Sequence, residues 1–230
     1  MKAITTVGSR EVPNDIKEIM TDCGYHFARK GYVGRDGGAL GSDTAFHKGV
    51  ERYWIEHGYN GDQAERYLPE NGSRGLYKSQ GKHIYVLEDL PHQELAAALA
   101  EKIHPAWHNC KDYARRLHTR NPYQVLGVDL LSPSQMLMCW APPTRDSISG
   151  GTRTAWELAR HNNIPCVNLH KKENVDKALA MIGYDKDFVI KPVEWRISEY
   201  LLPVFLEYCD SNPKYAEIFK QRCKNWDQKS

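Results

Sequence analysis

Three short segments combine glycine with hydroxyl or charged side chains, which are the residue types that bind phosphate groups. They are residues 8–10 (GSR), 37–39 (GGA) and 149–152 (SGGT). Glycine brings backbone N–H groups close to phosphate oxygens, because it has no Cβ. The third segment precedes an amphipathic stretch, and we expect it to bind a phosphate directly. The ligand contacts expected from the three segments are Gly8, Ser9, Arg10, Gly37, Gly38, Ala39, Gly150, Gly151 and Thr152.

Two carboxylates follow these segments and could act on a bound nucleotide. Asp43 comes after the second segment, and Glu157 comes after the third. Either one could contact a ribose hydroxyl group and serve as the acid in cleavage of an N-glycosidic bond. The alternative for Asp43 is a helix N-cap, and Thr152 could likewise be the cap of an ordinary turn.

Three further side chains are candidates for contacting a base. Asn121 and Gln124 could hydrogen-bond to its edge, and Trp140 could stack on it. Asn121 precedes Pro122 and is equally expected in a turn. Trp140 ends an apolar run, which is also typical of a core residue.

Several well-known binding motifs are absent from the sequence. It contains neither the Gly-Lys-Ser/Thr of a P-loop nor a full G-x-G-x-x-G fingerprint. The six cysteines form no C-x-x-C pair, and the ten histidines show no zinc-binding spacing. We therefore expect no metal site and no cofactor, and we interpret the cysteines as free thiols.

The glycine segments need strands and helices that bring them together. Apolar, β-prone runs occupy residues 2–7, 136–141 and 164–169, and an amphipathic stretch follows each run. This pattern predicts neighbouring parallel strands in an α/β, Rossmann-like sheet with helices on both faces. The carboxyl ends of parallel strands meet at one edge of a sheet, so all three glycine segments are expected to share one cleft.

The chain is predicted to form one domain with two additions. Residues 1–190 form the Rossmann-like domain, with an irregular insertion at about 58–87, where turn-forming residues are frequent. Residues 83–87 (HIYVL), at the end of this insertion, are a candidate strand. Residues 191–230 are predicted to be a helical extension that packs on the core. The net charge of +2 is too small to indicate nucleic-acid binding by itself. No signal peptide or run of about 20 apolar residues is evident, so we expect a cytoplasmic protein without a membrane partner.

Taken together, the glycine segments resemble those of the DprA/Smf DNA-processing proteins, members of the SLOG superfamily that also contains the LOG hydrolases. Residues 8–10 and 37–49 (GGALGSDTAFHKG) resemble the first two loops of that family. Residues 150–155, followed by 164–167 (IPCV), resemble its third loop and next strand. Residues 120–127 (RNPYQVLG) are similar to short DprA-like proteins of bacteriophages.

The resemblance covers about residues 1–169 and implies a Rossmann-like fold. With the glycine segments, it leaves three functions open. The first is binding of a nucleotide or nucleotide-derived phosphate ligand, with or without hydrolysis of its N-glycosidic bond. The second is DprA-like binding of single-stranded DNA in recombination, and the third is a sensor or sponge for a nucleotide signal. The LOG motif PGGxGTxxE is not matched. Thr152 directly follows the pair Gly150-Gly151, without the further glycine that the motif has before its threonine, and the nearest acid is Glu157. The oligomeric state also stays open, including a homo-oligomer.

Overall fold

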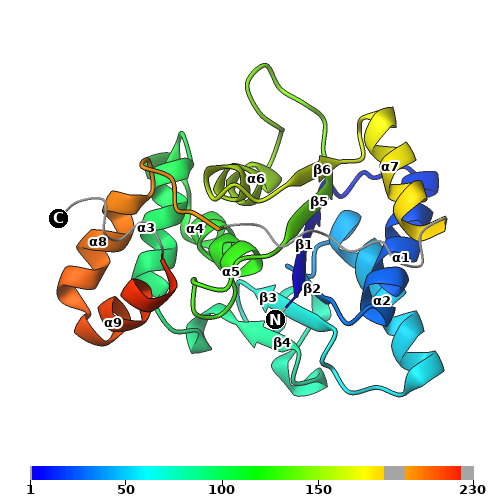
Figure 1. The fold of residues 1–230 in the computed structure, drawn as a ribbon, viewed down its shortest axis with the longest axis horizontal. Helices are drawn as coiled ribbons and strands as arrows, with labels where there is room; N and C mark the ends of the chain where they lie inside the picture. The colour runs from blue at the N-terminus through cyan, green and yellow to red at the C-terminus, as the bar shows by residue number, and fades with distance from the viewer. Residues whose placement is uncertain (1, 184–194, 224–230) are drawn as a thin grey trace.

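The computed structural model describes residues 2–183 and 195–223 of the chain. A parallel sheet of six strands, in the order β4-β3-β2-β1-β5-β6, forms the centre of this described part (Figure 1). The strands are β1 (Ala3–Gly8), β2 (Val33–Asp36), β3 (Ala64–Leu68), β4 (Ile84–Val86), β5 (Met136–Trp140) and β6 (Cys166–Asn168). The α/β, Rossmann-like class predicted from the sequence is therefore confirmed.

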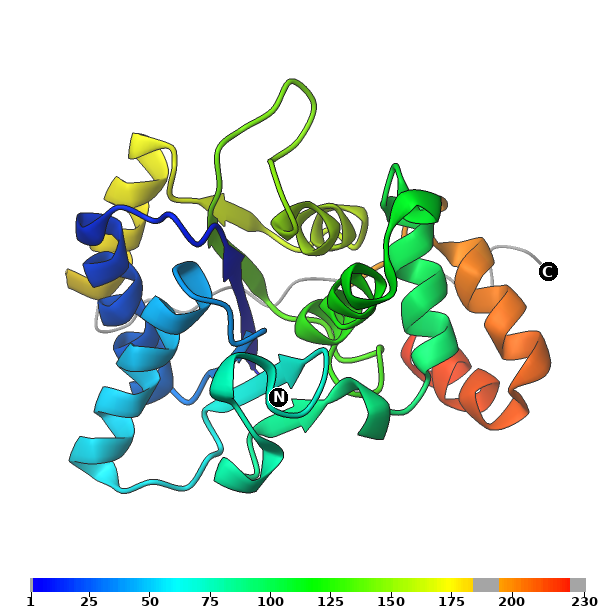
Figure 2. The ribbon, with the colours of Figure 1, turned by 180° about the vertical axis from the view of Figure 1, so that it is seen from behind.

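Helices cover both faces of the sheet and enclose two apolar cores. On one face the helices are α1 (Asn14–Arg29), α2 (Ser42–His57) and α7 (Lys172–Gly183). On the other face they are α3 (Gln93–Ile103), α4 (Asp112–Thr119), α5 (Asn121–Leu126), α6 (Thr152–His161), α8 (Leu202–Ser211) and α9 (Pro213–Arg222). Figures 1 and 2 show the two groups on opposite sides of the strands. Side chains alternate along β5, so Met136 and Met138 enter the first core while Leu137 and Cys139 enter the second.

Strands β1, β5 and β6 are parallel neighbours, as predicted for residues 2–7, 136–141 and 164–169. From β1 to β4 the chain adds strands in one direction. It then returns through α3, α4 and α5 and places β5 on the other side of β1. The point between β1 and β5 is therefore a topological switch point, where open α/β sheets bind ligands at the carboxyl ends of their strands.

The segment predicted to be an irregular insertion, residues 58–87, contributes two strands to the sheet: β4, which coincides with the candidate strand at 83–87, and β3, which was not predicted. Residues 64–68 (AERYL) form β3, which pairs with β2, and the short β4 pairs with β3. The sequence pattern concealed β3 because Glu65 and Arg66 interrupt it. Both side chains are nevertheless buried, since each forms an ion pair with a charged residue of β2. The irregular part of the segment is limited to the connections around β3, which include two short 3-10 helices, η1 (Ser73–Gly75) and η2 (Lys78–Gln80).

Asn121 and Pro122 begin helix α5, whereas a turn is one expectation from the sequence. Pro122 lies in the first turn of the helix, where its missing N–H group leaves no hydrogen bond unmade. All six residues of α5 are buried, and Gly127, with a φ of 78°, ends the helix. Asn121 and Gln124 are three residues apart and therefore share one face of this buried helix.

The described part of the C-terminal region, residues 195–223, contains the two helices α8 and α9. Phe205 and Phe219 are fully buried and belong to the same apolar core as Leu95 and Leu99 of α3. The predicted helical extension therefore shares a core with the sheet, although its residues 191–194 and 224–230 lie outside the described residues. None of the described helices combines the length and the apolar composition that crossing a bilayer requires.

Candidate functional site

A cleft with a volume of about 500 Å³ lies at the switch point between β1 and β5. Its walls come from the loops after β1 and β2, from α4 and α5, and from the start of α6. The predicted contacts that line it are Gly8, Ser9, Arg10, Ala39, Asn121, Gln124, Gly150, Gly151 and Thr152, together with the predicted acid Asp43. Residues 37–39 reach the cleft through Ala39 alone.

The start of α6 carries the clearest anion-binding feature of the cleft. The N–H groups of Gly150, Gly151 and Thr152 have no hydrogen-bond acceptor among the described residues. They lie at the N-terminus of a ten-residue helix, where the helix dipole adds partial positive charge. Gly150 has a φ of 74°, a conformation that favours glycine. Gly151 has an ordinary helical φ of −62°, and a Cβ there would meet open space.

Three arginines place positive charge around the cleft. Arg10 follows β1, Arg74 lies in η1, and both are exposed without a hydrogen bond or ion pair within residues 2–183 and 195–223. Arg74 has a left-handed φ of 53°, which costs a residue with a Cβ about 1–2 kcal/mol. Arg120 is buried and donates a hydrogen bond from Nη1 to the carbonyl oxygen of Tyr67 at 3.1 Å. Burial lowers the pKa of Arg120, and the nearby carboxylate of Asp43 opposes that shift.

The loop after β2 is held by two buried carboxylates. Asp43 Oδ2 accepts hydrogen bonds from the N–H groups of Gly37 at 2.9 Å and Ala39 at 3.3 Å. Asp36 Oδ1 accepts one from the N–H group of Gly38 at 2.7 Å. All three N–H groups of residues 37–39 are therefore used within the protein. This loop shapes the cleft, and the N–H groups left for a ligand belong to the start of α6.

Asp43 is the more suitable of the two predicted acids for proton transfer. It lies in the first turn of α2, is 2 % exposed and lines the cleft. Burial raises the pKa of Asp43 to about 6, and repulsion from Asp36 adds to the shift, while Arg120 and the two backbone N–H groups oppose it. A carboxyl group with a pKa near neutrality can both give and accept a proton.

Helix α5 braces the floor of the cleft. In the amide orientation that satisfies its neighbours, Gln124 accepts hydrogen bonds from Arg120 Nη1 at 3.0 Å and from the Gly37 N–H group at 2.7 Å. Its amide nitrogen donates to Asn121 Oδ1 at 2.9 Å. Asn121 Nδ2 in turn donates to the carbonyl oxygen of Gly151 at 3.3 Å. These two side chains therefore join the loop after β2 to the start of α6.

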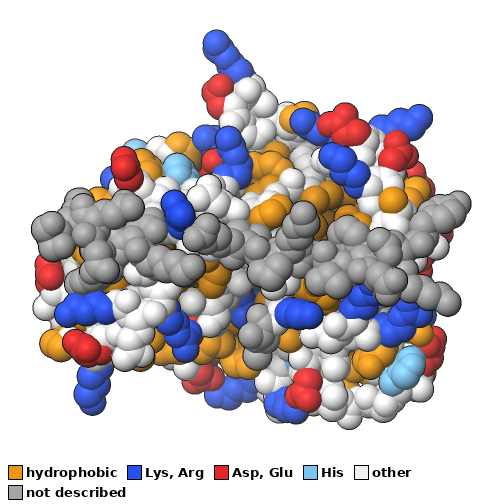
Figure 3. Space-filling model, viewed as in Figure 1, with side chains coloured by type: hydrophobic (Ala, Val, Ile, Leu, Met, Phe, Trp, Pro, Cys, Tyr) orange, Lys and Arg blue, Asp and Glu red, His pale blue; other side chains and the backbone are white. Residues whose placement is uncertain are grey.

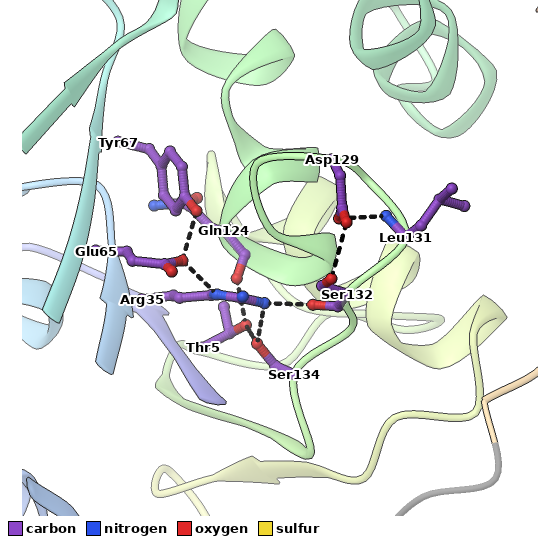
Figure 4. Close-up of polar contacts among 9 residues, drawn as sticks. All are labelled: Thr5, Arg35, Glu65, Tyr67, Gln124, Asp129, Leu131, Ser132 and Ser134. Atoms are coloured by element: carbon purple, nitrogen blue, oxygen red, sulfur yellow. Dashed lines mark hydrogen bonds and ion pairs between the residues drawn. The ribbon is translucent and has the colours of Figure 1, made fainter. Parts of the chain in front are cut away.

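A buried network centred on Arg35 fixes α5 to the sheet (Figure 4). Arg35 Nε pairs with Glu65 at 2.7 Å, and its Nη1 donates to the carbonyl oxygen of Ser132 at 2.6 Å. The hydroxyl group of Thr5 donates to the carbonyl oxygen of Gln124 at 2.6 Å. Figure 4 shows the guanidinium group between the strands and the loop that follows α5. Strands β1, β2 and β3 therefore determine where Gln124 lies in the cleft.

Four of the predicted site residues do not line the cleft: Gly37, Gly38, Trp140 and Glu157. Gly37 packs against Arg120 and Gln124. Glu157 accepts a hydrogen bond from Ser147 and pairs with Arg160 at 3.3 Å, near the segment between β5 and α6 that extends from the body in Figures 1 and 2. Five residues of helix turn Glu157 about 140° away from the start of α6, which explains its position. Trp140 packs with the core, and its ring lies 5.3 Å from that of His170. Gly38 faces apolar side chains instead of the cleft.

The structure also brings residues to the cleft that the sequence did not single out. Arg74 comes from the segment predicted to be an insertion. His118 of α4 hydrogen-bonds through Nδ1 to Thr154 Oγ1 at 2.9 Å, and burial lowers its pKa to about 4, so the imidazole is neutral. His104 and Cys110 lie beside it, and the three ligand atoms are all within 4.8 Å of one another. Their spacing, H-x5-C-x7-H, matches no common zinc motif, so only the fold reveals this cluster.

Comparison of the chain with protein-family models, with curated proteins and with solved structures finds no match. The resemblance to the DprA/Smf proteins therefore stays a prediction from the sequence. Function has to be argued from the chemistry of the cleft, because a Rossmann-like fold alone supports many functions.

Proposed function

We propose that the cleft binds a nucleotide whose phosphate group lies at the start of α6. The observation that carries this proposal is the set of unpaired N–H groups at Gly150, Gly151 and Thr152. Arg10 and Arg74 lie on the same cleft with no partner among the described residues, and they supply the charge that a phosphate requires. Backbone N–H groups at a helix start together with guanidinium groups form a typical phosphate site.

The rest of the cleft suits a nucleoside. Its volume of about 500 Å³ falls in the range of small-molecule sites, roughly 300–1,000 Å³. Ala114 and Leu117 of α4 provide an apolar wall on which a sugar or base can pack. Glu157 lies elsewhere, and Asp43 is engaged by backbone N–H groups. We therefore propose binding or sensing as the main function, and any hydrolysis of the N-glycosidic bond would depend on Asp43.

Single-stranded DNA is the second candidate, and a neighbouring groove favours it. This groove, with a volume of about 870 Å³, lies between α1 and α2 and shares Arg10 with the cleft. Lys17, Lys48 and Arg52 also line it, although Arg52 pairs with Asp22 at 3.1 Å. On the face of the molecule seen in Figure 3, Lys and Arg side chains are interspersed with Asp and Glu. We rank the nucleotide first, because the groove has no set of unpaired N–H groups like that of α6.

Calorimetric titration with nucleoside monophosphates and with short oligonucleotides tests the proposal. Thr152→Ala removes a hydroxyl donor at the phosphate and should weaken mononucleotide binding about 10- to 100-fold, the equivalent of roughly 1.5–3 kcal/mol for a hydrogen bond to a charged group. Lys48→Ala changes the groove alone and should leave mononucleotide binding unchanged. Arg145→Ala, an exposed arginine outside both sites, is the matched control.

The outcomes separate the candidates. Equal mononucleotide affinity in the wild type and in Thr152→Ala, with an unchanged circular dichroism spectrum, would remove the start of α6 from the site. Binding of oligonucleotides alone, with a steep dependence on salt and a loss in Lys48→Ala, would favour the DNA function. Release of free base over time, abolished by Asp43→Asn, would establish a hydrolase.

A further inference from the structure

A second cluster of reactive side chains lies beside the cleft. His104 follows α3, Cys110 follows the short helix η4 (Trp107–Asn109), and His118 lies on α4. Cys110 Sγ is 3.8 Å from His104 Nδ1, and the rings of His104 and His118 are 4.3 Å apart. All three side chains are half-buried. The connection between α3 and α4, which contains η4, thus brings the side chains of His104, Cys110 and His118 close together.

We propose that His104, Cys110 and His118 bind a zinc ion. Zinc–sulfur and zinc–nitrogen bonds of about 2.3 and 2.0–2.1 Å at tetrahedral angles place sulfur and nitrogen about 3.6 Å apart. The 3.8 Å between Cys110 Sγ and His104 Nδ1 is therefore close to the required spacing. His104 Nδ1 also accepts a hydrogen bond from the Ala106 N–H group at 3.3 Å, and the bond to the ion replaces it. A thiolate with two imidazoles suits zinc, whereas magnesium and calcium require the oxygen ligands that this cluster lacks.

The surroundings of His118 are those of an oriented metal ligand. In the tautomer whose Nδ1–H group donates to the hydroxyl oxygen of Thr154, 2.9 Å away, Nε2 carries the lone pair that binds the ion. Thr154 is 1 % exposed, so this hydrogen bond is protected from water. Such outer partners fix the tautomer and the ring orientation of a ligating histidine. Thr154 is in this sense a positioning residue.

The thiol of Cys110 can change partner when an ion binds. Its Sγ lies 3.6 Å from the carbonyl oxygen of Ala106, to which the S–H group donates. On binding, the thiol gives its proton to solvent and the thiolate forms the bond to zinc. The charge of the thiolate offsets half of that of the ion, which helps to accommodate it near the positive Arg153.

Three protein ligands leave one tetrahedral position, the pattern of zinc sites that also bind water or a ligand. His118 lines the cleft, so the ion lies next to the cleft wall. If a nucleotide binds in the cleft, one of its oxygen atoms can occupy the fourth coordination position of the ion. This role for the ion rests on the proposed nucleotide function. The metal site itself does not.

Metal content and cobalt spectroscopy test the site without any nucleotide. Apo-protein dialysed against zinc should retain one equivalent, and Co²⁺ should give tetrahedral d–d bands with a sulfur-to-cobalt charge-transfer band. Cys110→Ser should lose the charge-transfer band, and His118→Asn should lose stoichiometric binding. Cys166→Ser and His108→Asn, which lie outside the cluster, are matched controls and should behave like the wild type. Thr154→Val should bind zinc about 10- to 100-fold more weakly in competition with a chromophoric chelator.

Retention of much less than one equivalent, or a cobalt spectrum without the sulfur band in the wild-type protein, would overturn the proposal even if a variant failed to fold. Equal zinc content in Cys110→Ser, His118→Asn and the controls would also overturn it. Loading with copper but not with zinc would reject zinc as the ion. A confirmed zinc site in a protein that binds no mononucleotide would leave this inference standing and reject the proposed function.

Discussion

The glycines in and beside the cleft have different physical roles, although they look alike in the sequence. At Gly8 a Cβ would lie 2.1 Å from Ser42 Oγ and 2.7 Å from the carbonyl oxygen of Trp140, so this position is required for close packing. At Gly37 a Cβ would lie 1.2 Å from Arg120 Nη1. At Gly151 it would meet no atom within 4 Å. Only the first two are therefore required by the packing of the protein itself.

Replacing Gly8 and Gly151 by alanine should separate these roles. Gly8→Ala forces the end of β1 away from Ser42 at the start of α2 and from the end of β5. Overpacking of this kind costs about 1–3 kcal/mol of unfolding free energy. Gly151 is exposed and has a φ that alanine can adopt, so Gly151→Ala should change the unfolding free energy by no more than about 0.5 kcal/mol. Urea unfolding followed by circular dichroism measures both values. A loss for Gly151→Ala as large as that for Gly8→Ala would contradict this assignment of roles.

The residue types in the sequence predicted most of the residues that line the cleft. They did not predict which hydrogen-bond partner each backbone or side-chain group has. The segments 8–10 and 149–152 lie on the cleft, as predicted. The N–H groups of residues 37–39 are taken by Asp36 and Asp43, and that choice depends on how α2 packs on β2. The cluster around His118 was missed for the same reason, because its members come together only through the packing of α4 against α3 and the connection between them.

Strands β2 and β3 are joined by two buried ion pairs on opposite faces of the sheet. Their register aligns Arg35 with Glu65 and Asp36 with Arg66, so side chains of opposite charge are direct neighbours. The pairs measure 2.7 and 2.9 Å. Hydropathy predicts a buried strand from apolar residues, and it therefore missed β3, whose charges are neutralised only by a strand far away in the sequence. The four strands without buried charges, β1, β4, β5 and β6, coincide with the apolar runs that the sequence predicts as strands.

A double-mutant cycle should show strong coupling within the Arg35–Glu65 pair. Arg35→Met leaves the carboxylate of Glu65 buried without its cation, which costs about 3–5 kcal/mol. Adding Glu65→Gln removes the charge and keeps an acceptor for the hydroxyl group of Tyr67, which now bonds to Glu65 at 2.6 Å. The double variant should therefore be more stable than Arg35→Met alone by about 1–3 kcal/mol in urea unfolding.

The exposed pair of Arg52 and Asp22, 3.1 Å apart, is the matched control for that cycle. Its side chains are about half exposed, so the coupling between Arg52→Met and Asp22→Asn should stay below about 1 kcal/mol. Simple additivity of the two substitutions at Arg35 and Glu65 would show that the buried pair does not hold β2 and β3 together.

The whole molecule depends on one sheet with an apolar core on each face. Phe46 of α2 lies in the core formed with α1 and α7, and it stacks on Phe27. Phe219 of α9 lies in the other core, and it stacks on Phe205 of α8. Because alternate side chains of β5 enter both cores, neither can lose its packing without exposing the sheet that supports the other. The C-terminal helices are thus expected to unfold together with the sheet.

Truncating either phenylalanine tests this cooperativity. Phe46→Ala and Phe219→Ala each remove a fully buried ring and should lower the unfolding free energy by about 3–5 kcal/mol. Both variants should keep a single urea transition, with the same midpoint by tryptophan fluorescence and by far-ultraviolet circular dichroism. If α8 and α9 unfolded independently of the sheet, Phe219→Ala alone would give a different result. Part of the helical signal would be lost at low urea, and the main transition would be unchanged. Since Leu95 and Leu99 of α3 share the core of Phe219, we expect the single transition.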